Sequence, residues 1–209
     1  TRAATIRDEP AQYALEGSVF IAGAAVQWFR DGLKVIHSAP EIGDLAMRGD
    51  PASEVVFVPA FTGLGSPHWQ PAARGTLYGL TRATTLADIA RAALEGVAFQ
   101  VADLIKAIEE DLKETLPGLN VDGGMSRSDA FLGFQADVLG RPVRRSPETE
   151  STALGAALLA GLGANVWPDR ETALALLASG GKTFDPARDP SWRDKALERW
   201  RRAVDTTRE

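Results

Sequence analysis

Asp122, Gly123 and Gly124 stand between an apolar stretch and the start of a helical pattern, within LNVDGGMSRS at residues 119–128. In a parallel sheet, ligands bind beyond the carboxyl ends of the strands. A glycine turn there lets backbone N–H groups face an anion at a helix N-terminus. The plainer interpretation is a tight strand-to-helix turn with Ser126 as the N-cap. The glycines fit neither the GxxxxGK[ST] nor the GxGxxG phosphate loop.

A second unusual segment, TALGAALLAG at residues 152–161, consists almost entirely of alanine, glycine and leucine. Such a helix has small faces, and small faces allow another backbone to approach closely. We therefore expect a close-packed helix, one strand after the Asp-Gly-Gly turn.

No complete catalytic or metal-binding set accompanies these segments. His37 and His68 lack metal-ligand spacing, there is no HExxH or GxSxG motif, and the chain has no cysteine. Four carboxylates are candidate bases: Glu16, Glu95, Asp122 and Glu150. Nothing in their spacing pairs any two of them. The sequence therefore predicts half of a site, with no catalytic and no metal-binding residue of its own.

Apolar periodicity predicts alternating strands and helices around these segments. Strands are expected at residues 3–6, 12–15, 53–61, 76–82, 119–121 and 141–147. Helices are expected over about fifteen residues from an N-cap at Ser18, after Pro40, at 85–114 with Thr85 as cap, at 126–140, at 151–163 and from Trp192 to about Arg208. Residues 62–75, rich in Gly and Pro, are expected to form a structured loop. This order predicts an α/β fold with a partly parallel sheet.

Bulk composition narrows the function further. The 209 residues are 44% hydrophobic, enough for one sizeable domain, and carry a net charge of -5. An acidic chain lacks the basic face that nucleic-acid binding requires. No apolar run reaches the roughly 18 to 20 residues of a membrane span, and no signal-like segment opens the chain. We therefore expect a cytoplasmic protein, and because the chain opens without Met, a piece of a longer polypeptide.

Residues 75–96, GTLYGLTRATTLADIARAALEG, resemble the second signature of the FGGY family of carbohydrate kinases. The matching residues are Gly75, Leu77, Gly79, Leu80, Asp88, Ile89, Ala92, Ala93, Leu94 and Glu95. YALEGSVFIAGAAVQWFRD at 13–31 and VPAFTGLGSPHWQPAARG at 58–75 look like the corresponding stretches of its glycerol-phosphorylating members. The resemblance covers residues 11–169 and is to the C-terminal domain of that family.

The resemblance implies an actin-like ATPase (ribonuclease H-like) domain, with a central mixed sheet flanked by helices, and transfer of the ATP γ-phosphoryl group to glycerol. It implies that Gly23 and Gln27 line one side of the ATP/ADP pocket, and that Gly123, Gly124 and Ser128 line the other. Family members often carry asparagine where Ser128 stands. Serine is shorter, so we expect adenine contact there to need a bridging water. The small-residue helix would lie at the interdomain hinge.

By the same resemblance, residues 1–209 are one nucleotide-binding domain, and an N-terminal domain outside this chain supplies the catalytic aspartate, the glycerol contacts and most of the hold on Mg²⁺. We therefore expect the isolated chain to be inactive, and the whole protein to form homo-oligomers. Two alternatives stay open: another sugar or polyol kinase of the family, for example xylulokinase-like, and a non-catalytic interaction module. A dinucleotide-binding domain is disfavoured because its glycine pattern is missing.

Overall fold

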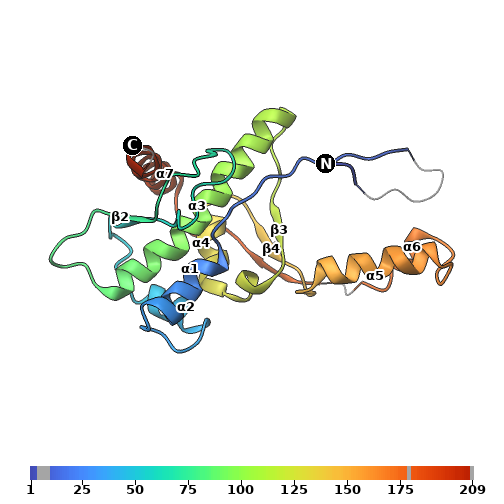
Figure 1. Cartoon of the computed structure of the whole chain (residues 1–209), viewed down its shortest axis with the longest axis horizontal. Coiled ribbons are helices and arrows are strands. Elements are labelled where there is room, and N and C mark those ends of the chain that lie inside the picture. Colours follow the sequence, from blue (N-terminus) through green and yellow to red (C-terminus); the bar gives the residue numbers. More distant parts are fainter. Residues whose placement is uncertain (4–9, 178–179, 208–209) are drawn as a thin grey trace.

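The computed structural model describes residues 1–3, 10–177 and 180–207. Figure 1 shows a body of helices and small sheets from which one helical segment projects. The helical elements are α1 (Gly23–Gln27), the π-helical turn η1 (Trp28–Gly32), α2 (Glu41–Met47), α3 (Leu86–Leu112), the 3₁₀ turn η2 (Gly124–Arg127), α4 (Asp129–Leu139), α5 (Ser151–Gly163), α6 (Arg170–Leu174) and α7 (Pro190–Thr207). The strands are β1 (Val56–Val58), β2 (Thr76–Tyr78), β3 (Leu119–Val121), β4 (Val143–Arg145) and β5 (Lys182–Phe184).

Helix α3 is the central element of the body, and α2, α4 and β1 all pack against it. It begins with a capping box, in which Thr85 accepts a hydrogen bond from the Asp88 backbone and the Asp88 carboxylate accepts from the Thr85 backbone. Near its middle it lies so close to β1 that a Cβ atom on Gly96 would stand 2.2 Å from the carbonyl oxygen of Phe57. Only glycine permits that approach, so the last residue of the signature stretch has a packing role.

The strands form two sheets. β1 and β2 are an antiparallel pair, and β3, β4 and β5 form a mixed sheet in which β3 and β4 are parallel and β4 and β5 antiparallel. In this second sheet Arg145 and Lys182 are register partners. These pairings confirm the α/β class and the partly parallel sheet. A helix connects the parallel strands β3 and β4, as a crossover requires.

Several predicted boundaries are wrong for identifiable reasons. The helix expected from Ser18 begins at Gly23, because Ser18 instead donates its backbone N–H to the hydroxyl of Ser66 and accepts from the Ser66 backbone. The strand expected at 12–15 is reduced to a single antiparallel bridge between Arg2 and Tyr13. Most of the strand expected at 3–6 lies outside the described residues. The short elements α6 and β5 carry too little periodicity to be predicted.

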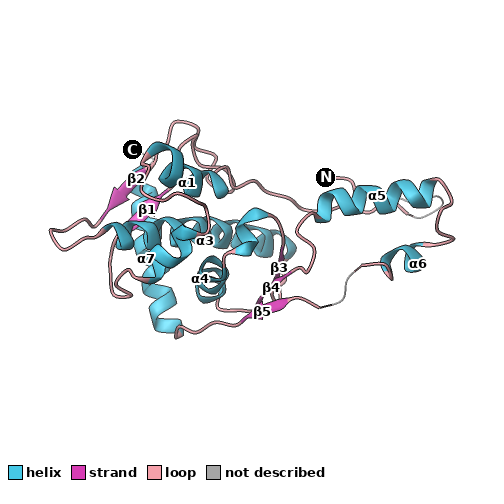
Figure 2. Cartoon of the chain, turned by 90° about the horizontal axis from the view of Figure 1, so that it is seen from below, coloured by secondary structure: helices cyan, strands magenta, loops and turns pink. Residues whose placement is uncertain are grey.

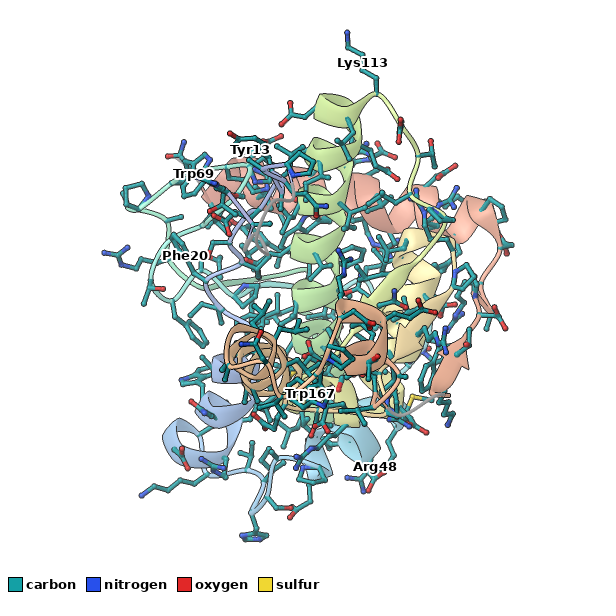
Figure 3. All side chains as sticks on the ribbon, turned by 90° about the vertical axis from the view of Figure 1, so that its right-hand side faces the viewer. Tyr13, Phe20, Arg48, Trp69, Lys113 and Trp167 are labelled. Carbon is teal, nitrogen blue, oxygen red and sulfur yellow. The ribbon has the colours of Figure 1, made fainter. Side chains whose placement is uncertain are left out.

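The projecting segment, residues 146–177 and 180–181, is called the arm below; it carries α5 and α6 (Figures 1 and 2). The ring of Trp167, labelled in Figure 3, covers Gly161 so closely that a Cβ there would lie 1.7 Å from it. Apart from Leu158 and Gly161, α5 is exposed or only partly buried. Within the described residues, the close packing expected for the small-residue helix α5 is thus found only where Trp167 covers Gly161.

The buried core runs between α1, α2, β1, α3, α4 and α7, and its largest fully buried side chain is Trp200. The Trp200 ring stacks on Phe99, and its indole N–H donates to Asp103, which also bonds His68. This cluster joins α7, α3 and the glycine-rich loop. No helix in the described part of the chain is long and apolar enough to cross a membrane.

Candidate functional site

A cavity of about 1210 Å³ lies between α1 and α2 on one side and η2 and α4 on the other. Its walls come from segments about a hundred positions apart in the sequence. The lining includes Gly23, Val26, Gln27, Arg30, Ile42, Gly43, Asp44, Met47, Arg91, Leu94, Gly124, Met125, Arg127, Ser128, Gly133, Phe134, Asp137, Arg145 and Arg188. Four of the five predicted site residues are in this set, and Gly123 is just outside it.

The predicted glycine turn between strand and helix is present, but its hydrogen bonding differs from the predicted row of N–H groups facing an anion. Gly123 has φ of +80°, a conformation that side chains other than glycine rarely adopt. Its N–H donates to the carbonyl of Thr149 at 3.2 Å, so this N–H is occupied within the chain. A Cβ on Gly124 would meet no atom within 4 Å, because Gly124 faces the open cavity. Gly123 therefore shapes the turn, and Gly124 leaves room beside it.

The N-cap of α4 is Ser128, and the alternative with Ser126 as cap is wrong. The Ser128 hydroxyl oxygen accepts from the backbone N–H of Phe131 at 3.2 Å. Ser126 is buried in η2, where its hydroxyl donates to the Gly123 carbonyl at 2.7 Å. The Ser128 hydroxyl keeps its hydrogen for donation into the cavity. Gly43 of α2 lies directly against this serine, because a Cβ there would be 3.3 Å from the Ser128 oxygen.

Gly23 and Gln27 approach this turn from α1. A Cβ on Gly23 would lie 3.9 Å from the Met125 side chain, so α1 and η2 face each other across the cavity mouth. The Gln27 side-chain amide makes no hydrogen bond within the described residues, and it is therefore open to bind a polar ligand.

Arg91 is a cavity residue that the sequence reading missed, because α3 was recognised from its apolar periodicity alone. It is 5% exposed, and its Nε donates to Glu95 at 2.9 Å while its guanidinium lies over the Phe134 ring. Burial raises the pKa of the Glu95 carboxyl, partly offset by the Arg91 charge. Glu95, one of the four candidate bases, is thus the largely buried ion-pair partner of a cavity residue and does not itself line the cavity.

Asp129, the first residue of α4, is held by two cations. Arg145 Nη1 donates to one carboxylate oxygen at 2.8 Å, and Lys182 Nζ donates to the other. The Lys182 ammonium and then the Arg145 guanidinium lower the pKa of Asp129 below its ordinary value of 3.8. The same Arg145 nitrogen also donates to the carbonyl of Ser126 at 3.2 Å. The turn before α4 is therefore fixed from the sheet side.

The remaining candidate residues are not brought together. His37 and His68 lie outside the cavity lining, and His68 bonds Asp103 at 2.8 Å. Among residues 1–3, 10–177 and 180–207, no group of three or more His, Cys, Asp or Glu side chains could hold a metal ion. The arrangement offers a roomy, partly apolar cavity with hydrogen-bonding groups at its mouth, which suits binding of an organic ligand.

Known proteins resemble the chain along most of its length. Residues 2–164 match the family model described as the FGGY family of carbohydrate kinases, C-terminal domain. A glycerol kinase of Myxococcus xanthus is 51% identical over 193 residues, covering 92% of this chain and 39% of that protein. A glycerol kinase of Rhizobium rhizogenes is 53% identical over 205 residues, covering 96% of this chain and 41% of that protein. The chain thus spans about two fifths of the length of these curated relatives.

Solved structures give a consistent picture of the fold. A Plasmodium falciparum glycerol kinase, solved with ADP, superposes with a TM-score of 0.85 at 36% identity, covering 96% of this chain and 40% of that one. A xylulose kinase of Lactobacillus acidophilus reaches a TM-score of 0.76 at 24% identity, covering 91% and 39%. The second likeness supports the fold alone, and together the two structures confirm the actin-like class.

Proposed function

The chain belongs to the FGGY family of carbohydrate kinases, and from this premise we propose that residues 1–209 are the C-terminal, nucleotide-binding domain of an ATP-dependent glycerol kinase. The observation that carries the proposal is the identity of about half the residues, along more than nine tenths of the chain, to proteins named glycerol kinase. Relatives with other acceptors superpose less closely and are less identical.

In the proposed complex, the cavity between α1 and α4 holds the adenosine part of ATP or ADP. Gly124 and Gly23 leave room at the mouth, while Gln27 and Ser128 provide hydrogen bonds. Gly123 acts indirectly, because its positive φ sets the course of the turn. The Ser128 oxygen already accepts from Phe131, so its remaining hydrogen can reach an adenine acceptor directly or through water. Support for these roles comes from the convergence of the four cavity residues on one space.

This domain would position the nucleotide rather than carry out chemistry. Phosphoryl transfer depends on positioning and on electrostatic stabilisation by groups around the phosphates. The described residues offer no acidic cluster for Mg²⁺. We therefore assign Mg²⁺ to the nucleotide phosphates and to residues outside this chain, since Mg²⁺ keeps several waters and binds through few carboxylates. The glycerol contacts, self-association of the whole protein and its cytoplasmic location also remain proposals that follow from the family.

Titration calorimetry with ADP and with ATP plus Mg²⁺ tests the nucleotide site. The variant Gly124→Val places a side chain in the open cavity, where it meets no protein atom. Gly155→Val is the matched control, because Gly155 also has no neighbour within 4 Å and lies in the arm outside the cavity lining. We expect weak binding by the native chain, loss of binding in Gly124→Val and native-like binding in Gly155→Val. Equal affinity of all three would place the nucleotide elsewhere.

A panel of acceptors tests the second part of the proposal. Joined to the N-terminal part present in its relatives, the protein is expected to phosphorylate glycerol in preference to xylulose and other polyols. Preference for a pentulose would favour the related sugar-kinase reading, while failure to bind nucleotide even in the whole protein would favour an interaction module. The isolated chain is expected to phosphorylate none of them.

A further inference from the structure

The base of the arm lies against the glycine turn of the proposed nucleotide site. The arm leaves the sheet after Arg145 at the end of β4 and returns to it at Lys182, the first residue of β5. These two residues are register partners on neighbouring antiparallel strands. Figure 2 shows β3, β4 and β5 together at the place where the arm begins.

Hydrogen bonds connect this base to the turn at several points. Arg145 Nη1 donates to the Ser126 carbonyl, to the Arg127 carbonyl at 3.5 Å and to the Asp129 carboxylate. Lys182 Nζ donates to the other oxygen of the same carboxylate. Their common acceptor is the residue that directly follows Ser128, the N-cap of α4.

A further bond comes from the arm itself. The carbonyl of Thr149, just before α5, accepts from the N–H of Gly123. Both ends of the turn, residues 123 and 128–129, are thus attached to the strands and residues that bracket the arm. Ser128 and Gly124 depend on this turn for their positions in the cavity wall.

The shape of arginine suits the junction. Its planar guanidinium presents several N–H groups in a fixed fork, whereas a lysine ammonium is a compact point charge on a flexible stem. The Arg145 guanidinium also lies over the Phe184 ring, 5.5 Å from its centroid, a contact that favours its position beside the turn. The Arg145 side chain is partly buried, and its charge is paired with the more exposed Asp129.

We propose that Arg145 is a positioning residue for nucleotide binding: with Lys182 and Thr149 it forms a latch that fixes the 123–128 turn to the base of the arm. The inference rests on the proposed function of the cavity and names the residue that keeps it in shape.

The test compares Arg145, the last residue of β4, with Arg141, which lies two residues before the strand and makes similar bonds. Arg145→Gln removes donors to a carboxylate and to backbone carbonyls at the nucleotide turn. Arg141→Gln removes the same kinds of bond at the other end of the strand, where Arg141 donates to Glu109 and to the Leu116 carbonyl, away from the cavity. Thermal unfolding measures the structural cost of each change, and calorimetry with ADP measures affinity.

We expect Arg145→Gln to weaken ADP binding by about tenfold, because ordering the loosened 123–128 turn would then consume part of the binding free energy. Arg141→Gln should leave ADP affinity unchanged although both variants unfold at lower temperature. Arg145→Lys should recover part of the affinity. In the whole enzyme the KM for ATP should rise while the KM for glycerol stays constant. Provided that the native protein binds ADP, an affinity that falls equally in both glutamine variants, or in neither, overturns the latch.

Hydrogen exchange separates failure of the latch from failure of the proposed function, because it needs no nucleotide. In Arg145→Gln the amides of Gly123, Ser126 and Ser128 should exchange faster, while those of β3 remain protected. Unchanged exchange at these amides refutes the latch whatever the calorimetry shows. Accelerated exchange in a protein whose native form does not bind ADP upholds the latch and refutes the nucleotide site.

Discussion

Replacing Gly96 by alanine should destabilise the protein even though alanine is the better helix former. The new Cβ would lie 2.2 Å from the Phe57 carbonyl oxygen, whereas a C–H···O contact needs about 3.3 Å or more, so α3 and β1 must separate by roughly 1 Å. Overpacking of this kind costs about 1–3 kcal/mol. The gain in helix propensity is only about 0.5–1 kcal/mol. The neighbour is backbone, so it cannot turn aside as a flexible side chain could.

Gly133→Ala provides the matched control. Gly133 also lies inside a helix of the body, but a Cβ there meets no atom within 4 Å, so this variant should gain about 0.5–1 kcal/mol. The free energies of unfolding of the two variants should therefore differ by about 1–3 kcal/mol. For a chain of this size, each kcal/mol corresponds to a Tm difference of roughly 2–4 °C. Calorimetric unfolding measures the difference.

Equal Tm values for Gly96→Ala and Gly133→Ala would refute the close approach of α3 to β1. Below its unfolding transition, Gly96→Ala should bind ADP as tightly as the native chain, because Gly96 does not line the cavity. A selective loss of ADP affinity would instead give this signature residue a direct part in the site.

Two further predictions concern the capping box and the buried tryptophan. Asp88→Ala should cost about 1–2 kcal/mol of unfolding free energy, because it removes the bonds that the carboxylate accepts from the Thr85 backbone, the Thr85 hydroxyl and the Asp50 backbone, while the bond from the residue-88 N–H to Thr85 stays. Those bonds lower the pKa of Asp88 below its ordinary 3.8. The stabilisation of the folded state by the Asp88 carboxylate is therefore present above pH 3.8 and lost as pH falls through the native-state pKa. When the native chain and Asp88→Ala are unfolded at pH values from about 7 to about 2, the difference between their free energies of unfolding should shrink. Trp200→Phe should retain stacking on Phe99 but lose the bond to Asp103, which should lower the free energy of unfolding by about 1–3 kcal/mol. Denaturant unfolding measures it, and an unchanged midpoint would show that the bond contributes nothing.

Local patterns predicted the parts of the fold that local interactions determine. Helix α3 has a long apolar period and a capping sequence at Thr85, so its start was found correctly. The start of α1 was wrong because a distant residue, Ser66, engages Ser18. The capping carboxylate of Asp88 also accepts from the backbone of Asp50, a bond that no local pattern contains.

The candidate site was predictable only in part. The Asp-Gly-Gly turn was visible as strand-to-helix punctuation, but the pairing of Gly124 with Gly23 came from resemblance, since no spacing relates residues a hundred positions apart. The N-cap at Ser128 could not be separated from Ser126 because both serines precede the helical pattern. Arg145 lies in the strand predicted at 141–147 and was assigned no role, because its bonds to Ser126, Arg127 and Asp129 form only in the folded chain.

The adjacency of Arg145 and Lys182 has a consequence for how the family can vary. A segment whose two ends lie one strand spacing apart can lengthen or shorten without altering the sheet register. The entropic cost of closing such an excursion grows only with the logarithm of its length. The arm can therefore change in length at little cost, while Arg145 and Lys182 at its base keep their pairing. The antiparallel pairing of β4 and β5 thus holds both ends of the arm in place whatever the length of the arm.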